Sequence, residues 1–514
     1  MHVDKNDWYG GAEAAFSLDE VKDWTKTIGE SHSSLHSSLY FDDASIERPE
    51  PISDQGHGPK LSFSRAYNLA LAPQVIYTSA RLLDVLVSSK SHKQLEFLAM
   101  GSWWVYSKHD TAQNEPSSSV ENEQDVKASE ASAASSSKLL RIPTNREDVA
   151  FSDSSIDLRA KRSLMKILRF ILNFEEQREI WDPYRDSSFS DFLSLHFKLP
   201  PTLQPLLIAL TLTPFPPSRT TTAYALPRIA RHLRSTGKLG PGFSSVIPRW
   251  GGVSEIIQVA CRAAAVGGAT YALDRGINSD ADAVWADAGK ETATSRTLER
   301  VQVGLVGDGI VKASWIVGGE DDMTAFRETT EHEEEERPSN ETLSAVTKTI
   351  AVVSSPLKSL FPVVEGSQVP AGAIVVFPTG SLTISDPELK SDETPPVYLI
   401  IHSSDTGECP AGQSKLNCIP LGSRMMINCK ISLSTLSATS LLIKRNKLMR
   451  ILPSYLPNVK IPSSKSRLML FRCAICLNCT VEKSREASAQ VGSGGAASYR
   501  WRFQATFCPL ECTI

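Results

Sequence analysis

The chain opens with Met1-His2-Val3-Asp4-Lys5-Asn6-Asp7-Trp8-Tyr9-Gly10-Gly11. A short apolar lead that ends in an acid and precedes a Tyr-Gly-Gly turn is typical of the second strand of a dinucleotide-binding unit, where the acid meets a cofactor ribose. Asp4 fits that position, but no glycine-rich phosphate turn precedes it to anchor a flavin. We therefore expect an α/β chain with a Rossmann-like domain that lacks its N-terminal strand, holds no cofactor and works by binding.

Composition limits the classes of partner. The net charge is −4, from 54 basic and 58 acidic residues, so nothing favours nucleic acid as a partner. No apolar run reaches about 18 residues, so we expect no transmembrane helix. The nine cysteines are an odd number and crowd toward the C-terminus, which is unlike a secreted disulfide framework. We expect a cytoplasmic protein.

Five segments follow from shifts in composition. We expect the first part of the Rossmann-like domain, with a binding region, at 1–111 and its second part, with a sheet, at 241–412. A mainly helical domain at 139–240 would separate them. The Ser- and Glu-rich stretch at 112–138 buries too little apolar surface to offset its ordering entropy, which predicts a disordered insert. The tail at 413–514 loses periodicity, and we expect it to be atypical, as an erroneous gene model would make it.

Periodicity places the main elements. Apolar residues of the 157–240 region recur at spacings of three and four, which predicts amphipathic helices. Further helices are expected at 81–87, 192–199, 203–212 and 255–265. Alternating or continuous apolar runs predict strands at 301–306, 313–317, 350–354, 373–377 and 397–402.

Several motifs in register resemble the superfamily of Rab GDP dissociation inhibitors and Rab escort proteins. They are Asp4 to Gly11, Ser64-Arg65-Ala66-Tyr67-Asn68 through Pro73, and Ile247-Pro248-Arg249-Trp250-Gly251-Gly252 with the helix after it. Lys161 to Leu168 and the polar insert are more similar to the fungal escort branch. The resemblance covers about residues 1–412. It implies a flavin-monooxygenase-like domain, a helical second domain and no catalysis on the chain itself.

The resemblance also implies partners. These would be the GDP form of Rab GTPases, the α/β dimer of Rab geranylgeranyltransferase, the geranylgeranyl lipid of the Rab tail and, transiently, a membrane. It implies a Rab-binding surface at Tyr9, Glu255, Gln258 and Arg262. Spacings of three, four and seven put the last three on one helix face, where charge-assisted hydrogen bonds can read a partner. The alternative is a solvated face with an internal Glu–Arg pair.

Further sites are implied less specifically. Arg65, Tyr67, Val75 and Ile76 match the region that engages the Rab C-terminal tail, with ordinary core packing as the alternative. The lipid would be lined by Leu164, Leu168, Ile171, Leu207 and Leu210, for which a plain core is the alternative. The transferase would contact the helix at 224–234 through Arg228, Arg231 and Arg234, unless these form a solvated face. The loop before Glu255 is one residue longer than is usual in the superfamily.

Two rival functions remain open. A plain Rab GDP dissociation inhibitor would recycle prenylated Rabs without serving the transferase. A flavin-dependent oxidoreductase would use Asp4. The close spacing of Cys473, Cys476 and Cys479 invites a metal reading, but no second ligand pair stands at a suitable distance, and we expect no metal.

Overall fold

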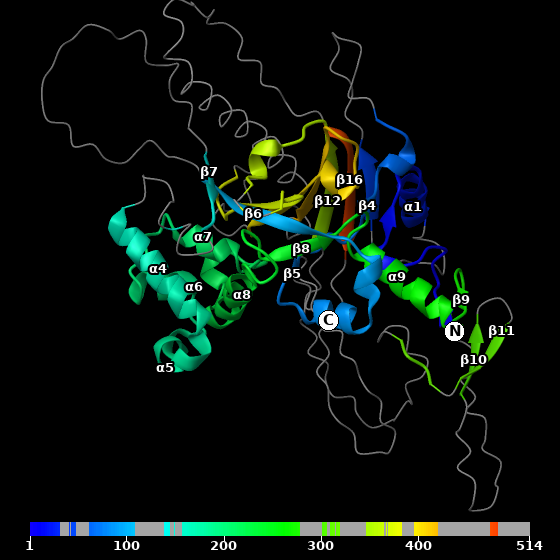
Figure 1. The fold of residues 1–514 in the computed structure, drawn as a ribbon, viewed down its shortest axis with the longest axis horizontal. Helices are drawn as coiled ribbons and strands as arrows, with labels where there is room; N and C mark the ends of the chain where they lie inside the picture. Colours follow the sequence, from blue (N-terminus) through cyan, green and yellow to red (C-terminus); the bar gives the residue numbers. More distant parts are fainter. Residues whose placement is uncertain are drawn as a thin grey trace, which may run out of the picture.

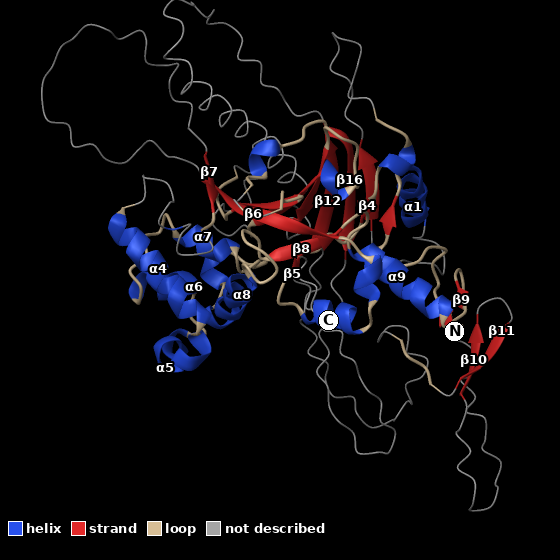
Figure 2. Ribbon diagram, in the orientation of Figure 1, coloured by secondary structure: helices blue, strands red, loops and turns tan. Residues whose placement is uncertain are grey.

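The computed structural model describes residues 1–30, 41, 43–47, 61–107, 138–143, 149, 157–277, 301–305, 309–313, 315–318, 346–363, 366, 368–382, 395–419 and 473–481. A sheet of ten strands forms the centre of this part of the chain, and helices flank it (Figure 1). The helices are α1 (Leu18–Glu30), α2 (Arg81–Ser88), α4 (Leu158–Leu172), α5 (Arg178–Trp181), α6 (Phe189–Leu195), α7 (Gln204–Ala209), α8 (Thr222–Ser235) and α9 (Val253–Val266). Figure 2 shows α4 to α8 on one side of the view, with α1 and α9 on the other.

The central sheet has the strand order β3-β16-β12-β15-β14-β13-β6-β8-β5, and β7 pairs with β6 outside this path. Among the described strands of this sheet, pairs are antiparallel except β6 and β13, which run parallel. The strands are β3 (Asp43–Glu47), β5 (Ile76–Tyr77), β6 (Phe97–Ser107), β7 (Lys138–Arg141), β8 (Ser245–Pro248), β12 (Val346–Val353), β13 (Gly372–Phe377), β14 (Val397–Ser403), β15 (Ser414–Ile419) and β16 (Cys473–Val481).

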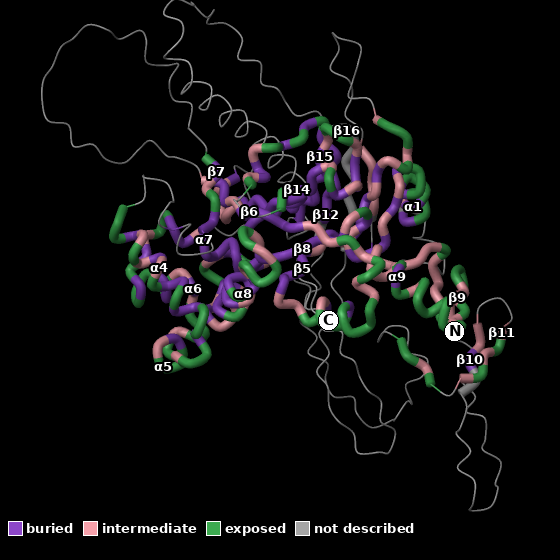
Figure 3. The backbone as a smooth tube through the Cα atoms, viewed as in Figure 1, coloured by how far each residue is buried: buried purple, intermediate pink, exposed green. Residues whose placement is uncertain are grey.

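The sheet is buried on both faces, which explains the continuous apolar runs of its strands. In β13, Ile374 and Val376 join the core beneath the helices, whereas Val375 and Phe377 join a second core on the opposite face. Side chains of a strand alternate between faces, so a strand covered on both sides has apolar residues at every position. The tube coloured by burial shows these central strands in purple (Figure 3).

The helical layer is continuous with the sheet. One cluster of buried side chains extends from Leu164 and Ile171 in α4 to Tyr398 and Ile400 in β14. The Tyr398 hydroxyl donates to the Thr213 carbonyl oxygen at 3.0 Å. Helix starts are capped by Asp157, Ser188 and Thr221, whose side chains accept from nearby backbone N–H groups. Apolar burial and this hydrogen bond together fix the helices against the sheet.

The domain around the sheet is discontinuous in sequence, as predicted. β6 precedes the helical layer and its parallel partner β13 follows it, with Met100 paired to Gly372. A Cβ on Gly372 would lie 2.5 Å from the Met100 sulfur, so the Met100 side chain packs directly over this glycine. The Rossmann-like segments before and after the helices therefore form one sheet.

Two predicted segment boundaries need correction. β7 begins at Lys138 and pairs with β6, so the start of the 139–240 segment belongs to the sheet. β15 begins at Ser414 and is buried between β12 and β14, so the predicted tail contains a central strand. The alternating Leu416 and Cys418, which face the second core, explain why this segment is a strand. The insert prediction for 112–138 lies, except for Lys138, outside the described residues.

Smaller strand pairs complete the description. β1 (His2–Val3) runs parallel to β9 (Tyr271–Ala272), and β2 (Ala15–Phe16) is antiparallel to β4 (Leu69–Ala70). β10 (Val301–Leu305) and β11 (Gly309–Ala313) form a hairpin, whereas residues 315–317 are not in a strand, so the prediction of a strand at 313–317 was wrong except at Ala313. In the described part of the chain, no helix combines the length and apolar character needed to cross a bilayer.

Candidate partner-binding surface

The α9 polar face, which we define as Glu255, Gln258 and Arg262, points away from the core. Gln258 and Arg262 are exposed, and Glu255 is half-buried. Val253, on the opposite side of the helix, is buried, and Val259, one turn after Glu255 on the same side, is buried as well. Burial raises the pKa of the Glu255 carboxyl above its usual range. Helical spacing therefore presents an acid, an amide and a guanidinium together to a partner.

Tyr9 lies near this helix. The β1–β9 pairing ties the N-terminal segment to the strand that follows α9, and His2 N–H donates to the Thr270 carbonyl oxygen at 2.8 Å. The rings of Tyr9 and Tyr271 are 5.4 Å apart between centroids. Burial, a hydrogen bond with Tyr271 and the neighbouring Cys261 of α9 raise the pKa of Tyr9 to about 12. The Tyr9 hydroxyl is therefore neutral at physiological pH and can donate to a partner.

The start of α9 is held in a conformation that requires its Trp-Gly-Gly sequence. Trp250 has φ 77°, in the left-handed region, and its N–H donates to the Thr406 carbonyl oxygen at 2.8 Å. Its ring lies on Gly407, where a Cβ would come within 2.5 Å, and its side chain is still 49% exposed. A Cβ on Gly251 would meet the Ser254 hydroxyl at 2.4 Å. Close packing thus fixes an exposed indole next to the α9 polar face.

Two residues beside this surface were not among the predicted site residues. A Cβ on Gly251 would lie 3.1 Å from both the Asn68 side-chain nitrogen and Glu255 Oε1, so these two polar groups are neighbours. The Arg249 guanidinium lies 4.6 Å from the centre of the Trp250 ring and pairs with Glu96 at 2.8 Å. Asn68 and Trp250 occur in the quoted motifs, but their distance from Glu255 depends on the tertiary fold and cannot be inferred from sequence spacing.

The predicted tail-binding residues divide into one exposed and three buried side chains. Arg65 is exposed, whereas Tyr67, Val75 and Ile76 are 1%, 1% and 0% exposed. The Tyr67 hydroxyl accepts a hydrogen bond from Ser62 N–H at 3.0 Å, which is an internal contact. In this conformation the three buried residues match the alternative of core packing.

Exposed apolar surface lies instead on the neighbouring helix α2. Leu82 and Leu86 of α2 belong to the same buried cluster as Val253 at the start of α9. Val85 and Val87, on the remaining faces of α2, are 48% and 59% exposed. The amphipathic pattern of 81–87 predicted the helix, but not that two valines would be left outside the core.

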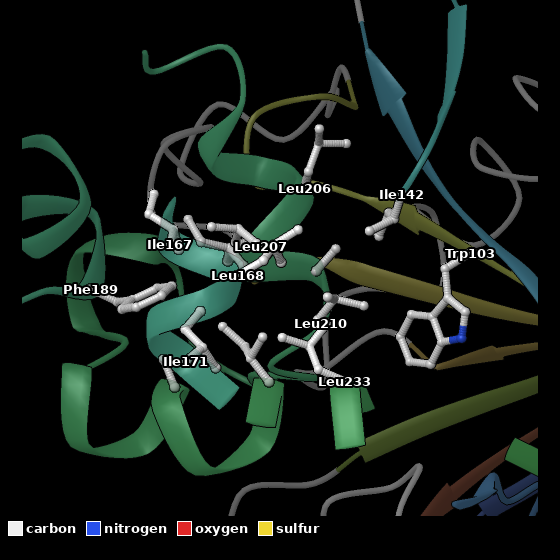
Figure 4. Packing of buried hydrophobic residues seen from close by; sticks show 14 of the residues in the cluster. Trp103, Ile142, Ile167, Leu168, Ile171, Phe189, Leu206, Leu207, Leu210 and Leu233 are labelled. Carbon is white, nitrogen blue, oxygen red and sulfur yellow. The ribbon is translucent and has the colours of Figure 1, made fainter. Parts of the chain in front are cut away.

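The five predicted lipid-lining residues are core residues in this conformation. Leu164, Leu168, Ile171, Leu207 and Leu210 are all at most 7% exposed and belong to one cluster. Figure 4 shows four of them, all but Leu164, packed among the helices. A cavity of about 10 Å³, close to the space of one water, lies at Trp103 and His232, and none of the five lines it. Lipid entry would require the helices to separate.

The predicted basic face of α8 is partly used within the protein. Arg234 Nη2 donates to the Leu172 carbonyl oxygen at 2.6 Å, and Nη1 donates to Glu175 at 2.8 Å. Arg228 Nη1 donates to the Tyr224 carbonyl oxygen, and its guanidinium lies 3.6 Å from the Tyr224 ring centre. Arg234 thus clamps the end of α4 to α8 through hydrogen bonds and is engaged within the protein.

A basic stripe on α4 is more accessible. We define it as Arg159, Arg162, Lys166 and Arg169, whose spacings of three, four and three put them on one face. All four are exposed. No binding site was predicted at these four cations from the sequence.

Asp4 is the candidate residue for a flavin contact, and Cys473, Cys476 and Cys479 are the candidate metal ligands. Asp4 Oδ1 accepts from the Asn6 backbone and side-chain nitrogens at 3.0 and 2.9 Å, so this carboxylate closes its own turn. Among the described residues, no cluster of His, Cys, Asp and Glu could hold a metal ion. Cys473, Cys476 and Cys479 lie in β16.

Comparisons with known proteins agree with this fold. The chain is 32% identical to Rab proteins geranylgeranyltransferase component A of Saccharomyces cerevisiae over 277 residues, which are 53% of this chain and 39% of that protein. It is 26% identical to the Candida albicans protein of the same name over 415 residues, 80% of this chain and 54% of that protein. The chain thus spans about half the length of these relatives or less.

A solved structure is also similar. The crystal structure of Rab GDI from Plasmodium falciparum superposes with a TM-score of 0.51 at 14% identity, over 94% of this chain and 84% of that one, which is a likeness of fold alone. The sequence model of a family described as GDP dissociation inhibitor matches residues 48–306. Because this match spans half of the chain, the chain belongs to the GDP dissociation inhibitor family.

Proposed function

We propose that this protein is a Rab escort protein. It binds GDP-bound Rab GTPases, presents them to the Rab geranylgeranyltransferase α/β dimer and accompanies the prenylated product toward a membrane. The protein has no catalytic role of its own. The observation that carries the proposal is the exposed α9 polar face beside the neutral Tyr9 hydroxyl, in a chain whose relatives bear the name of a geranylgeranyltransferase component.

The chemistry of the surface fits a protein partner. Arg262 and Glu255 can form charge-assisted hydrogen bonds, and the half-exposed Trp250 supplies the kind of rigid aromatic anchor that dominates interfaces. The exposed Val85 and Val87 lie on α2, which shares a buried cluster with the start of α9. An apolar segment of the Rab tail would therefore continue onto α2 after the GTPase domain has docked on α9.

The contact with the transferase is proposed for the basic stripe on α4. Its four cations are exposed on a helix whose other face is fixed to the core, so an acidic partner surface could dock without rearrangement. The lipid is proposed to enter among the leucines of the helical layer. Burial of a prenyl chain returns about 0.8 kcal/mol per methylene, which can offset the cost of parting these helices.

The experiment is a reconstituted prenylation assay. The full chain, a GDP-loaded Rab, the transferase dimer and labelled geranylgeranyl diphosphate are mixed, and label on the Rab is measured. Label that depends on the chain supports the escort function. Binding of the GDP-loaded Rab without such label would support the rival, a Rab GDP dissociation inhibitor, which the family match also favours. Absence of Rab binding would contradict both.

A cytosolic location is proposed together with this function, because Rab proteins are prenylated after synthesis. Cys261 and Cys409 are free thiols, as a reducing compartment predicts. Cys418 takes part in a disulfide, which speaks against such a compartment. Fluorescence microscopy of a tagged chain, with and without a membrane-bound Rab, tests the location and the transient membrane contact.

A further inference from the structure

A buried set of charged side chains lies beneath the α9 polar face. We define the buried triad as His402 in β14, Glu408 in the β14–β15 connection and Lys415 in β15. The three are 3%, 1% and 0% exposed. One Glu408 carboxylate oxygen contacts Lys415 Nζ and the other contacts His402 Nδ1. His402 and Lys415 are direct cross-strand partners, so the hairpin itself brings them to the same carboxylate.

The Glu408 carboxyl favours its charged form despite its burial. Burial alone would raise the pKa of Glu408, but Lys415 and His402 outweigh it and lower that pKa to about 2. Burying two charges costs several kcal/mol each, and a pair of well-packed apolar residues is often as stable or more stable. A contribution to global stability is therefore a weak explanation for the triad, and a local structural task explains it better.

The connection held by the triad contacts both sides of the start of α9. On one side, the Glu408 carbonyl oxygen accepts from Asn68 N–H at 3.0 Å, and Lys415 Nζ donates to the Asn68 carbonyl oxygen at 3.5 Å. On the other side, the Thr406 carbonyl oxygen accepts from Trp250 N–H, and Gly407 supports the Trp250 ring. Asn68 in turn neighbours Glu255. Hydrogen bonds thus join the connection to Asn68 and Trp250, and these two residues lie close to Glu255 at the start of α9.

We infer that the buried triad positions the α9 polar face: by locking the 404–413 connection, Glu408 fixes Asn68 and Trp250, and through them the orientation of Glu255. Glu408 does not touch the partner. It sets the affinity for the partner by holding the binding groups in place before the encounter, which lowers the entropy cost of association. This inference rests on the proposed function, because the affinity concerned is that for a GDP-loaded Rab.

The main test separates positioning from stability. In the double variant Glu408→Gln/Lys415→Met of the full chain, both buried charges are gone, so the free energy of unfolding should stay near that of the unchanged chain. The Kd for a GDP-loaded Rab should nevertheless rise about tenfold, within the range of couplings through shared contacts. A Kd that stays within twofold of that of the unchanged chain would overturn the inference. Ile229→Val, a mild change in the distant helical core, is the matched control and should leave the Kd unchanged.

A second measurement keeps the inference testable should the charge variants fail to fold. Asn68→Ala leaves the triad intact and removes the side chain next to Glu255. Its effect on Kd should be non-additive with that of Glu255→Gln and additive with that of Arg262→Ala, which lies two turns further along α9. Additivity in both cycles would overturn the inference. Failure of the unchanged chain to bind the GDP-loaded Rab would instead overturn the proposed function.

Discussion

Tyr9 and Tyr271 meet edge to face, with their ring planes at 87° and their centroids 5.4 Å apart. The pair joins the N-terminal segment to the strand that follows α9, and it orients the Tyr9 hydroxyl beside the α9 polar face. Edge-to-face rings contribute about 0.5–1.5 kcal/mol beyond their buried area, so the aromatic contact survives loss of either hydroxyl. The role of the hydroxyl can therefore be measured separately from that of the ring.

Tyr9→Phe should weaken binding of a GDP-loaded Rab by about 2- to 10-fold, the value of one lost hydrogen bond, with little change in unfolding free energy. Titration with a fluorescently labelled Rab measures it. Tyr271→Phe is the matched control and should change the Kd by less than about twofold. Equal losses in the two variants would show that the hydroxyl pair acts only within the protein.

Reversing the charge at the exposed end of the α9 polar face should impair binding without impairing folding. Arg262→Glu should raise the Kd for a GDP-loaded Rab by roughly 30-fold or more, because it removes a charge-assisted donor and introduces repulsion. Arg262 is exposed, so the free energy of unfolding should change by less than about 0.5 kcal/mol. Calorimetric titration and urea denaturation test the two parts, and a matching loss of both would contradict the prediction.

Arg234 should stabilise the helical layer rather than contact a partner. It donates to the last carbonyl of α4 at Leu172 and to Glu175. Arg234→Ala should lower the free energy of unfolding by about 1 kcal/mol, mainly through the lost carbonyl contact. Glu175→Ala should cost less than about 0.5 kcal/mol because the ion pair is solvent-screened. Urea unfolding measures both, and an unchanged midpoint for Arg234→Ala would contradict the clamp.

Stability should fall on the acid side because His232 is buried and neutral. Burial lowers the pKa of His232 to about 3, whereas a histidine in the unfolded chain titrates near about 6.5. Below about pH 6.5 the unfolded chain therefore binds a proton that the folded chain does not, and unfolding becomes easier by up to about 1.4 kcal/mol per pH unit. Glu408, with its pKa lowered to about 2, adds to this loss once the pH falls below about 4.5.

The matched variant for this pH dependence is His232→Gln, measured by urea unfolding between pH 6.5 and 4.5. The difference in slope between the variant and the unchanged chain isolates His232 from the other histidines. The variant should have the shallower slope, and parallel curves would contradict the assignment.

The basic stripe on α4 should affect prenylation and leave Rab binding intact. Arg162→Glu/Arg169→Glu should reduce chain-dependent labelling by roughly tenfold at limiting transferase, because two attractive charges become repulsive. The Kd for a GDP-loaded Rab should be unchanged, since α4 and α9 lie on opposite sides of the view in Figure 2. Loss of labelling in Arg231→Glu with full labelling in the stripe variant would place the transferase on α8 instead.

Local pattern predicted much of the fold. The 3.6-residue period located α2, α8 and α9, and the apolar runs located β12, β13 and β14, each to within a few residues. The same pattern also predicted the α9 polar face, because the spacing of three residues on a helix is a local property. Tyr9 came from its place in the motif, and the β1–β9 pairing carries it to α9.

Properties set by distant contacts could not be predicted in this way. An apolar residue such as Ile76 is equally consistent with a groove and a core until the covering strand β8 is known. Which valines of α2 stay exposed depends on which face of that helix packs against the rest of the protein. The buried triad unites residues of two strands and their connection, and in the sequence it is three isolated charged or polar residues. The boundary at 413 was misplaced because composition changes there while the pairing of β15 does not.

The parallel pairing of β6 with β13 has a consequence for how this protein is made. Met100 leaves the ribosome long before Gly372, and translation at about 5–20 residues per second separates the two by roughly 15 to 55 s. During that interval the apolar strand Phe97–Ser107 has no partner on its β13 side, and an unpaired apolar edge invites aggregation. The nascent chain should therefore depend on a holding chaperone until its second half emerges, and the yield of native protein should rise when such a chaperone is co-produced.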